Sequence, residues 1–195
     1  MLYICKNDIF KMNTLKPFKG CFLISEPFLP DPNFKRKVIY LTEHNNEGSI
    51  GFVLNNPLNI DVETVADNLP DCKHPLYQGG PVELDTLHYV HTLGEQIKNS
   101  QEINKGIYWG GKFDDLKSLL AKKELSANEI KFFIGYSGWG KGQLKAEINE
   151  KSWIVSSALS KFVFSNEDNL WKKVLQSMGQ KYEIVAGFPD DPSLN

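Results

Sequence analysis

The sequence predicts an α+β protein in which helices pack around a mixed, largely antiparallel sheet. Short runs of β-branched and aromatic residues recur along the chain, at residues 21–24, 37–42, 49–54, 131–136 and 153–155. Hairpin patterns outnumber strand–helix–strand alternations, which favours antiparallel pairing. A doubly wound parallel fold is the weaker alternative, because it requires that alternation throughout.

The clearest hairpin joins residues 37–42 to residues 49–54. The loop between them is His44-Asn45-Asn46-Glu47-Gly48, and Asn and Gly tolerate the positive φ angles of such turns. Further strands are predicted at 76–78 and 87–91, on either side of a Gly79-Gly80-Pro81 turn, and at 107–109.

Helices are predicted where apolar residues recur at helical spacing. Asp61 is expected to cap a helix that buries Val62, Val65, Ala66 and Leu69. Two more are predicted over 114–122 and 143–149. Ser165 and Asp168 resemble a capping box before a last helix that ends at Gly179, with an apolar face of Leu170, Trp171, Val174, Leu175 and Met178.

The length of 195 residues fits one domain. We expect an irregular arm over residues 1–19, a single domain over 20–188 and a frayed acidic tail over 189–195. An alternative start at Met12 would leave residues 1–11 outside the protein.

Composition excludes several classes of protein. The net charge is −2, and acidic and basic residues are interleaved along the chain. The longest basic cluster is Lys35-Arg36-Lys37, so the charge pattern disfavours nucleic-acid binding without excluding it. The three cysteines form no C-x-x-C pair, which indicates reduced thiols and no zinc site. With no apolar run of about 20 residues, we expect no membrane contact, and cytoplasm is the predicted compartment.

One glycine-rich segment resembles a phosphate-binding loop. Residues 135–142, Gly-Tyr-Ser-Gly-Trp-Gly-Lys-Gly, satisfy G-x-x-x-x-G-K, but Gly142 stands where a Ser or Thr must ligate magnesium. Trp139 would also crowd backbone amides that have to surround phosphate. We interpret the segment as a glycine turn that joins a strand to a helix, with Trp139 packed over it, and predict no cofactor.

Polar residues near the first hairpin form the other candidate site. Asn33 and Arg36 lie in a proline-bounded loop, where Arg36 would contact an anion or partner and Phe34 would anchor the loop in the core. The candidate surface, with no metal ligand and no catalytic set, consists of Asn33, Arg36, Glu43, His44, Asn45, Trp139 and Gln143.

The remaining reactive side chains offer no such set. His88 and His91 are three apart on a predicted strand and so point to opposite faces. We predict that Cys21 is a small core residue and not an activated thiol.

Several strings resemble the AlgH/YqgE family of bacterial proteins from about residue 20 to residue 188. They include Gly20-Cys21-Phe22-Leu23-Ile24-Ser25, Gly51-Phe52-Val53-Leu54-Asn55-Asn56-Pro57, Tyr77-Gln78-Gly79-Gly80-Pro81-Val82 and Gly135-Tyr136-Ser137-Gly138-Trp139-Gly140, with Glu147 and Trp153 further on. The resemblance implies a bifurcated sheet curled into a partial barrel. It implies no established reaction, although some relatives are connected with transcriptional regulation.

A non-enzymatic regulatory or interaction protein with a protein partner is therefore the leading hypothesis. The alternative is a small-ligand binder or an unrecognised hydrolase. Its pocket would form where the 31–36 loop and the 43–45 hairpin end converge.

Overall fold

The computed structural model describes residues 15–66, 69, 72–122 and 125–190. Its strands are β1 (Cys21–Ser25), β2 (Val38–His44), β3 (Gly48–Val53), β4 (Pro57–Asp61), β5 (Pro75–Gln78), β6 (Val82–His91), β7 (Gln101–Asn104), β8 (Ile107–Trp109), β9 (Ile130–Gly140) and β10 (Trp153–Ser157). Its α-helices are α2 (Phe113–Ala121), α3 (Gln143–Asn149), α4 (Ser160–Val163), α5 (Leu170–Ser177) and α6 (Gln180–Ala186), with 3₁₀ turns η1 (Val62–Thr64) and η2 (Gly94–Gln96).

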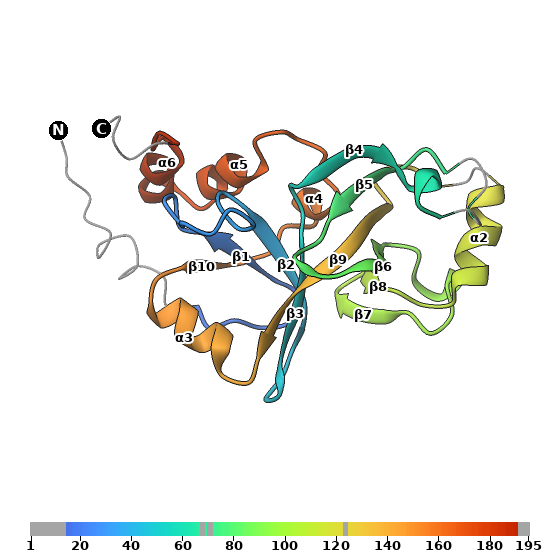
Figure 1. Ribbon diagram of the computed structural model, residues 1–195, viewed down its shortest axis with the longest axis horizontal. Coiled ribbons are helices and arrows are strands. Elements are labelled where there is room, and N and C mark those ends of the chain that lie inside the picture. Colours follow the sequence, from blue (N-terminus) through green and yellow to red (C-terminus); the bar gives the residue numbers. More distant parts are fainter. Residues whose placement is uncertain (1–14, 67–68, 70–71, 123–124, 191–195) are drawn as a thin grey trace.

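The α+β class and the curled, bifurcated sheet are confirmed. The sheet runs β10-β1-β2-β3-β9-β6-β8-β7, and β5 branches from β9 and carries β4 as an outer strand. Pairing is antiparallel except between β5 and β9. In Figure 1, β9 crosses the middle of the molecule and connects its two ends.

The branch depends on the long strand β9. Its first part, up to Ile134, lies between β5 and β6, whereas Ser137 to Gly140 pair with β3. Between these parts Gly135 has a φ of 64°, in the left-handed region that favours glycine. A Cβ at this position would lie 2.7 Å from the carbonyl oxygen of Val82, so the change of partner requires glycine.

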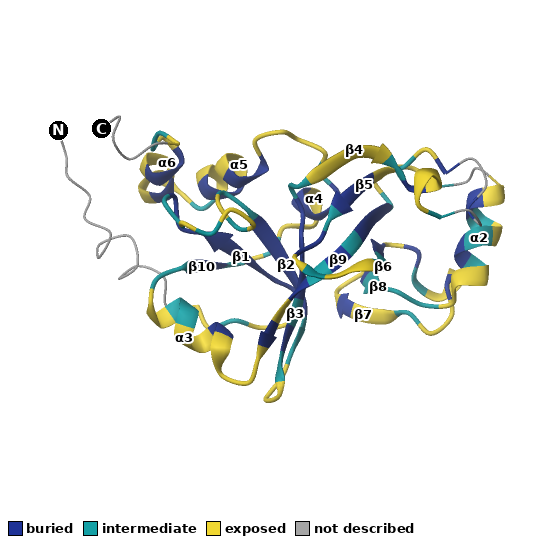
Figure 2. Cartoon of the chain, in the orientation of Figure 1, coloured by how far each residue is buried: buried dark blue, intermediate teal, exposed yellow. Residues whose placement is uncertain are grey.

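Strands β1 and β2 are buried on both faces of the sheet over most of their length. Phe22, Ile24 and Tyr40 pack with α4, α5 and α6 in one apolar cluster. The alternate residues Cys21 and Leu23 pack in a second cluster with Trp139, Leu144 and Trp153, near α3. Because helices cover both faces, these strands are continuous apolar runs, and Figure 2 shows them as buried.

The two ends of the molecule share one core. The first cluster also contains Val90 of β6, Ile103 of β7, Ile107 of β8 and Phe133 of β9. A third cluster lies at the far end, between η1, β5, β6, β9 and α2, and includes Val62, Leu76, Tyr89, Leu116, Leu120 and Phe132.

Several sequence expectations about helix starts were wrong. After Asp61 only the 3₁₀ turn η1 forms, the Asp61 side chain caps nothing, and Val65 is exposed. Residues 67, 68, 70 and 71 lie outside the described part. Ser165 accepts the backbone N–H of Glu167 in a local turn, and α5 begins only at Leu170, after Asn169.

The chain also forms elements that the sequence pattern did not predict. These are β4, β7, α4 and α6. The predicted strand 131–136 extends to Gly140, so the glycine turn expected over residues 135–142 was wrong. The turn is confined to Lys141 and Gly142, where Gly142 has a φ of 77°.

Candidate functional site

A groove of about 630 Å³ lies beside the end of the β2–β3 hairpin. Three segments line it: the hairpin end, the turn from β9 into α3, and the stretch before β1. Its lining residues are Leu15, Lys16, Pro17, His44, Asn45, Asn46, Gly48, Ser49, Gly140, Lys141, Gly142, Leu144, Lys145, Ile148 and Asn149.

The hairpin end is fixed by Asn45. Its side-chain oxygen accepts the backbone N–H groups of Glu47 at 2.8 Å and Gly48 at 3.1 Å. Its amide nitrogen donates to the Glu43 carboxylate at 2.7 Å. All three bonds are local, so the Asn45 amide and the Glu43 carboxylate, which is not among the lining residues of the groove, serve first to shape the turn.

A hydroxyl and an imidazole meet inside the same groove. His44 Nδ1 and Ser49 Oγ are 2.7 Å apart, and the two residues are cross-strand partners in the hairpin. Ser49 is buried and His44 is half-buried. A nucleophile and a base at this separation are the minimum for nucleophilic catalysis, although pairing across a hairpin also produces the contact.

One wall of the groove is formed by α3, and Glu147 attaches this helix to the sheet. One of its carboxylate oxygens accepts the indole N–H groups of both Trp139 and Trp153, each at 2.8 Å. Its other oxygen accepts the Gln143 amide at 2.9 Å, while Gln143 Oε1 accepts the N–H of Gly140 at 3.0 Å. Trp139 and Gln143, expected as binding residues, therefore attach α3 to β9.

A second cavity, of about 460 Å³, shares residues of the hairpin with the groove. Glu43, Asn45 and Trp139 line it together with Val82 and Tyr136. Five of the seven candidate residues thus gather in one region: Glu43, His44, Asn45, Trp139 and Gln143.

The charged residues in the described lining of the groove are all of one sign. Its described lining holds Lys16, Lys141 and Lys145 and no carboxylate. Glu47, at the hairpin tip, pairs with Lys141 at 3.5 Å, and both side chains are largely exposed, so water screens most of the attraction. The groove therefore presents a basic surface over aliphatic side chains.

Asn33 and Arg36 lie elsewhere. They precede β2, whereas His44 is its last residue, and an extended strand of this length spans roughly 20 Å or more. The 31–36 loop and the hairpin end therefore do not converge, and the described structure lacks the shared pocket on which the alternative hypothesis depended. The reason is that β2 separates the two segments.

The loop itself is held by Asp31. Its carboxylate accepts the N–H of Asn33 at 2.8 Å, and Asn33 itself is exposed. Phe34 packs edge-on to Trp153, with ring centroids 5.5 Å apart, which confirms its role as an anchor.

Arg36 contacts the C-terminal segment. Its Nη2 donates to the carbonyl oxygens of Phe188, at 2.7 Å, and Pro189, and its Nε lies 2.8 Å from the Asp190 carboxylate. The Nε–H is not aimed at that oxygen, so this last contact is an ion pair without a hydrogen bond. Pro189 and Asp190, expected in a frayed tail, are thus held. Residues 191–195 lie outside the described part.

Other predicted side chains are structural. His88 packs against Phe52 and Trp109, while His91 stacks on Tyr108, so the two histidines do face opposite ways. Cys21 is fully buried, and burial raises the pKa of its thiol to about 11, which confirms a core residue and opposes reactivity at neutral pH.

The described residues contain no group of three His, Cys, Asp or Glu side chains able to hold a metal ion. Gly135 to Gly140 form strand instead of a phosphate-binding loop. Within the described ranges no helix is long and apolar enough to span a membrane.

The sequence pattern did not identify the residues that make the central contacts of this region. Glu147 was noted only within a family pattern, and its i, i+4 spacing from Gln143 was the one local signal available. Ser49 gave none, because its partner His44 lies across a strand pair.

Comparisons with known proteins agree with this architecture. A UPF0301 protein of Chlorobium limicola is 40% identical over 186 residues, which cover 95% of this chain and 98% of that protein. UPF0301 protein CT0663 of Chlorobaculum tepidum is 42% identical over 182 residues, covering 93% and 96% of the two chains.

Two solved structures are similar as well. The AlgH protein of Pseudomonas aeruginosa superposes with a TM-score of 0.71 at 28% identity, covering 91% of this chain and 98% of AlgH. Protein DIP2367 of Corynebacterium diphtheriae shares the fold, with a TM-score of 0.80 at 21% identity over 96% and 100% of the chains. The sequence profile of the AlgH-like family matches residues 22–183, and the chain belongs to that family.

Proposed function

We propose that this chain is a non-enzymatic regulatory protein of the cytoplasm, connected with transcription, that binds an acidic segment of a protein partner. The segment would lie in the groove between the hairpin end and α3. The observation that carries the proposal is the described lining of this groove, which combines three lysines and no carboxylate with the aliphatic side chains of Leu144 and Ile148.

Such a lining suits a peptide better than a small substrate. Exposed lysines attract carboxylates at long range and speed association, and an apolar floor supplies the area that a peptide buries. Two backbone donors of the lining residues are already used, since the N–H groups of Gly48 and Gly140 donate to Asn45 and Gln143. The groove therefore offers shape and charge, with few free polar groups to orient a reacting atom.

Charge reversal tests the proposal. A photoreactive residue placed at Asn149 should crosslink one protein in cells, and the purified partner should bind the wild-type chain with a salt-dependent affinity. Lys141→Glu with Lys145→Glu should weaken that affinity at least about tenfold, since each reversal replaces an attraction with a repulsion. Lys172→Glu with Lys181→Glu makes the same change in net charge on α5 and α6 and should leave the affinity unchanged.

The regulatory part has its own measurement. Transcript levels in a strain carrying Lys141→Glu and Lys145→Glu should follow those of a deletion strain, and the α5–α6 control strain should match wild type. Crosslinking to nucleic acid in place of protein, or equal effects of the two double variants, would contradict the proposal.

The contact between His44 and Ser49 favours hydrolysis as a second candidate function. The hydroxyl lies 2.7 Å from Nδ1 and both residues line the groove. One observation opposes this candidate. The nearby Glu43 carboxylate accepts a hydrogen bond from the Asn45 amide, so it is engaged in the turn and does not orient the His44 base. A fluorophosphonate probe should label the wild-type chain and fail to label Ser49→Ala if this candidate is correct, with Thr86→Ala, whose hydroxyl lies 2.9 Å from His88 Nε2, as the control.

A further inference from the structure

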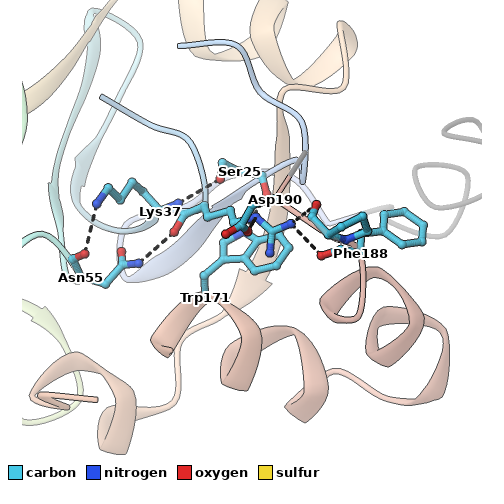
Figure 3. Close-up of polar contacts among 8 residues, drawn as sticks. Ser25, Lys37, Asn55, Trp171, Phe188 and Asp190 are labelled. Carbon is cyan, nitrogen blue, oxygen red and sulfur yellow. Dashed lines mark hydrogen bonds and ion pairs between the residues drawn. The ribbon is translucent and has the colours of Figure 1, made fainter. Parts of the chain in front are cut away.

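The C-terminal segment Phe188–Asp190 docks as a short peptide would. The ring of Phe188 stacks on that of Phe28, with centroids 5.8 Å apart and planes inclined by 13°. Its carbonyl oxygen and that of Pro189 accept hydrogen bonds from Arg36, and the Asp190 carboxylate pairs with the same guanidinium. Figure 3 draws the polar contacts as dashed lines, with Phe188, Asp190 and Trp171 labelled.

The receiving surface, which we call the cradle, consists of Phe28, Arg36 and Trp171. The Arg36 guanidinium lies over the Trp171 ring, with its central carbon 4.7 Å from the ring centroid. The indole N–H of Trp171 donates to the carbonyl oxygen of Ser25 at 2.9 Å, and the ring is buried. Stacking on a fixed aromatic ring orients the guanidinium for planar acceptors.

The cradle is held by bonds that do not involve the tail. Arg36 has a φ of 53°, an unfavourable backbone angle for an arginine. Asn55 stabilises it by donating to the Arg36 carbonyl at 2.9 Å and accepting the N–H of Val38 at 2.9 Å. Lys37, next in the chain, donates its N–H to Ser25 Oγ at 3.0 Å. Strain that the surrounding structure maintains in this way is typical of preformed sites.

Beyond Phe188, whose side chain packs against the first apolar cluster, the tail is lightly held. Phe188 keeps one helical bond, from its N–H to the Val185 carbonyl at 3.1 Å. The bond and ion pair described for Pro189 and Asp190 both go to Arg36, and the Asp190 side chain is 80% exposed. An ion pair this exposed contributes little. A competing segment therefore has few contacts to displace.

From this geometry we infer that the cradle is a binding site for an extended aromatic-proline-acid segment of a partner protein, which the chain's own tail occupies in its absence. The aromatic ring would stack on Phe28, two backbone carbonyls would accept from Arg36, and the acid would pair with the guanidinium. Because such recognition uses main-chain carbonyls and only two side chains, the other residues of the bound segment can vary. This surface lies at the opposite end of β2 from the groove and is independent of it.

The experiment uses the full chain and a defined probe. A fluorescein-labelled peptide with the sequence of residues 187–192, Gly-Phe-Pro-Asp-Asp-Pro, is titrated with wild-type protein and with the double variant Phe188→Ala, Asp190→Ala, and anisotropy is recorded. A tethered tail competes at an effective concentration of the order of millimolar. We therefore expect the double variant to bind the peptide about tenfold more tightly than wild type.

Two controls locate the binding. Adding Arg36→Gln to the double variant should abolish it, and a peptide with alanine in place of the phenylalanine and the first aspartate should not bind. Because Arg36→Gln could perturb the loop, Phe28→Ala serves as a second cradle variant, with folding checked by circular dichroism. In the double variant, where the tail is weakened, millimolar peptide should shift the indole N–H resonance of Trp171.

Equal peptide affinity for wild type and double variant, or binding that survives Arg36→Gln and Phe28→Ala, would overturn the inference. So would a dimer of the wild-type chain that forms with concentration and is lost on Arg36→Gln, since that result would assign the cradle to the tail of a second copy.

Discussion

Trp139 and Trp153 donate their indole N–H groups to the same carboxylate oxygen of Glu147, each over 2.8 Å, and their rings meet edge to face with centroids 6.0 Å apart. Both rings are almost completely buried, although they lie on different strands. A single acceptor on α3 thus satisfies two donors that the core cannot leave unpaired.

Replacing that acceptor should destabilise the protein strongly. Glu147→Leu leaves two buried N–H groups without a partner, each costing about 1–3 kcal/mol, so we expect the free energy of unfolding to fall by about 2–6 kcal/mol. Glu147→Gln retains an oxygen and should cost less. Urea unfolding followed by far-UV circular dichroism measures both. Glu150→Leu, at an exposed position just after α3, should have almost no effect, and a cost equal to that of Glu147→Leu would contradict this account.

Lys131 should make stability depend on pH. It lies in β9 with only 2% exposure, its Nζ donates to the Ser165 carbonyl at 2.6 Å and it sits 3.9 Å from the Tyr77 ring centroid. Burial lowers the pKa of Lys131 from 10.5 to about 7. Between these values the unfolded chain binds the proton and the folded chain does not, so stability rises with pH, by at most about 1.4 kcal/mol per unit from this group.

The measurement compares wild type with Lys131→Met, which keeps the length of the side chain and removes the charge. The free energy of unfolding of wild type, minus that of the variant, should increase from pH 7 to pH 8.5. This window lies below the ionisation of the buried Cys21 and Cys72, and subtraction cancels groups common to both proteins. A difference that stays flat across the window would show that Lys131 keeps its proton in the folded state.

Gly135→Ala should weaken the branch of the sheet. The substitution imposes a left-handed backbone angle on alanine and places its Cβ 2.7 Å from the Val82 carbonyl oxygen. We expect a loss of at least about 2 kcal/mol in the free energy of unfolding. Gly142→Ala is the matched control, because Gly142 also has a positive φ but nothing lies within 4 Å of its Cβ. It should lose only about 1 kcal/mol, and equal losses would remove the close contact from the explanation.

Asn55→Ala should release the loop that carries Arg36. It deletes the donor to the Arg36 carbonyl and the acceptor of the Val38 N–H, which predicts a loss of about 1–3 kcal/mol. Hydrogen exchange at the Val38 amide should accelerate in the variant. Asn46→Ala, at the exposed tip of the hairpin, supplies the comparison and should leave that amide unchanged.

Local sequence patterns were sufficient for the hairpin and for much of the sheet. The run from Lys37 to Thr42, the Asn/Gly loop and the run from Ser49 to Leu54 are neighbours in the chain, and turn chemistry acts over a few residues. The same holds for α2 and α3, whose spacing predicted them within a residue or two. The strand β4 was missed because its side chains are mostly exposed and it is held by backbone pairing with β5, which no periodicity reports.

The sequence by itself determined an α+β chain of the AlgH-like family with an antiparallel hairpin at its centre, because these features depend on side-chain pattern and local turns. The tertiary structure alone decided which polar residues meet. Arg36 contacts a carbonyl 152 residues away, and Glu147 gathers donors from β9 and β10, whereas β2 separates Arg36 from His44. Such contacts follow from the order in which strands pair, and strand order is set by burial of the whole core, which no single segment encodes.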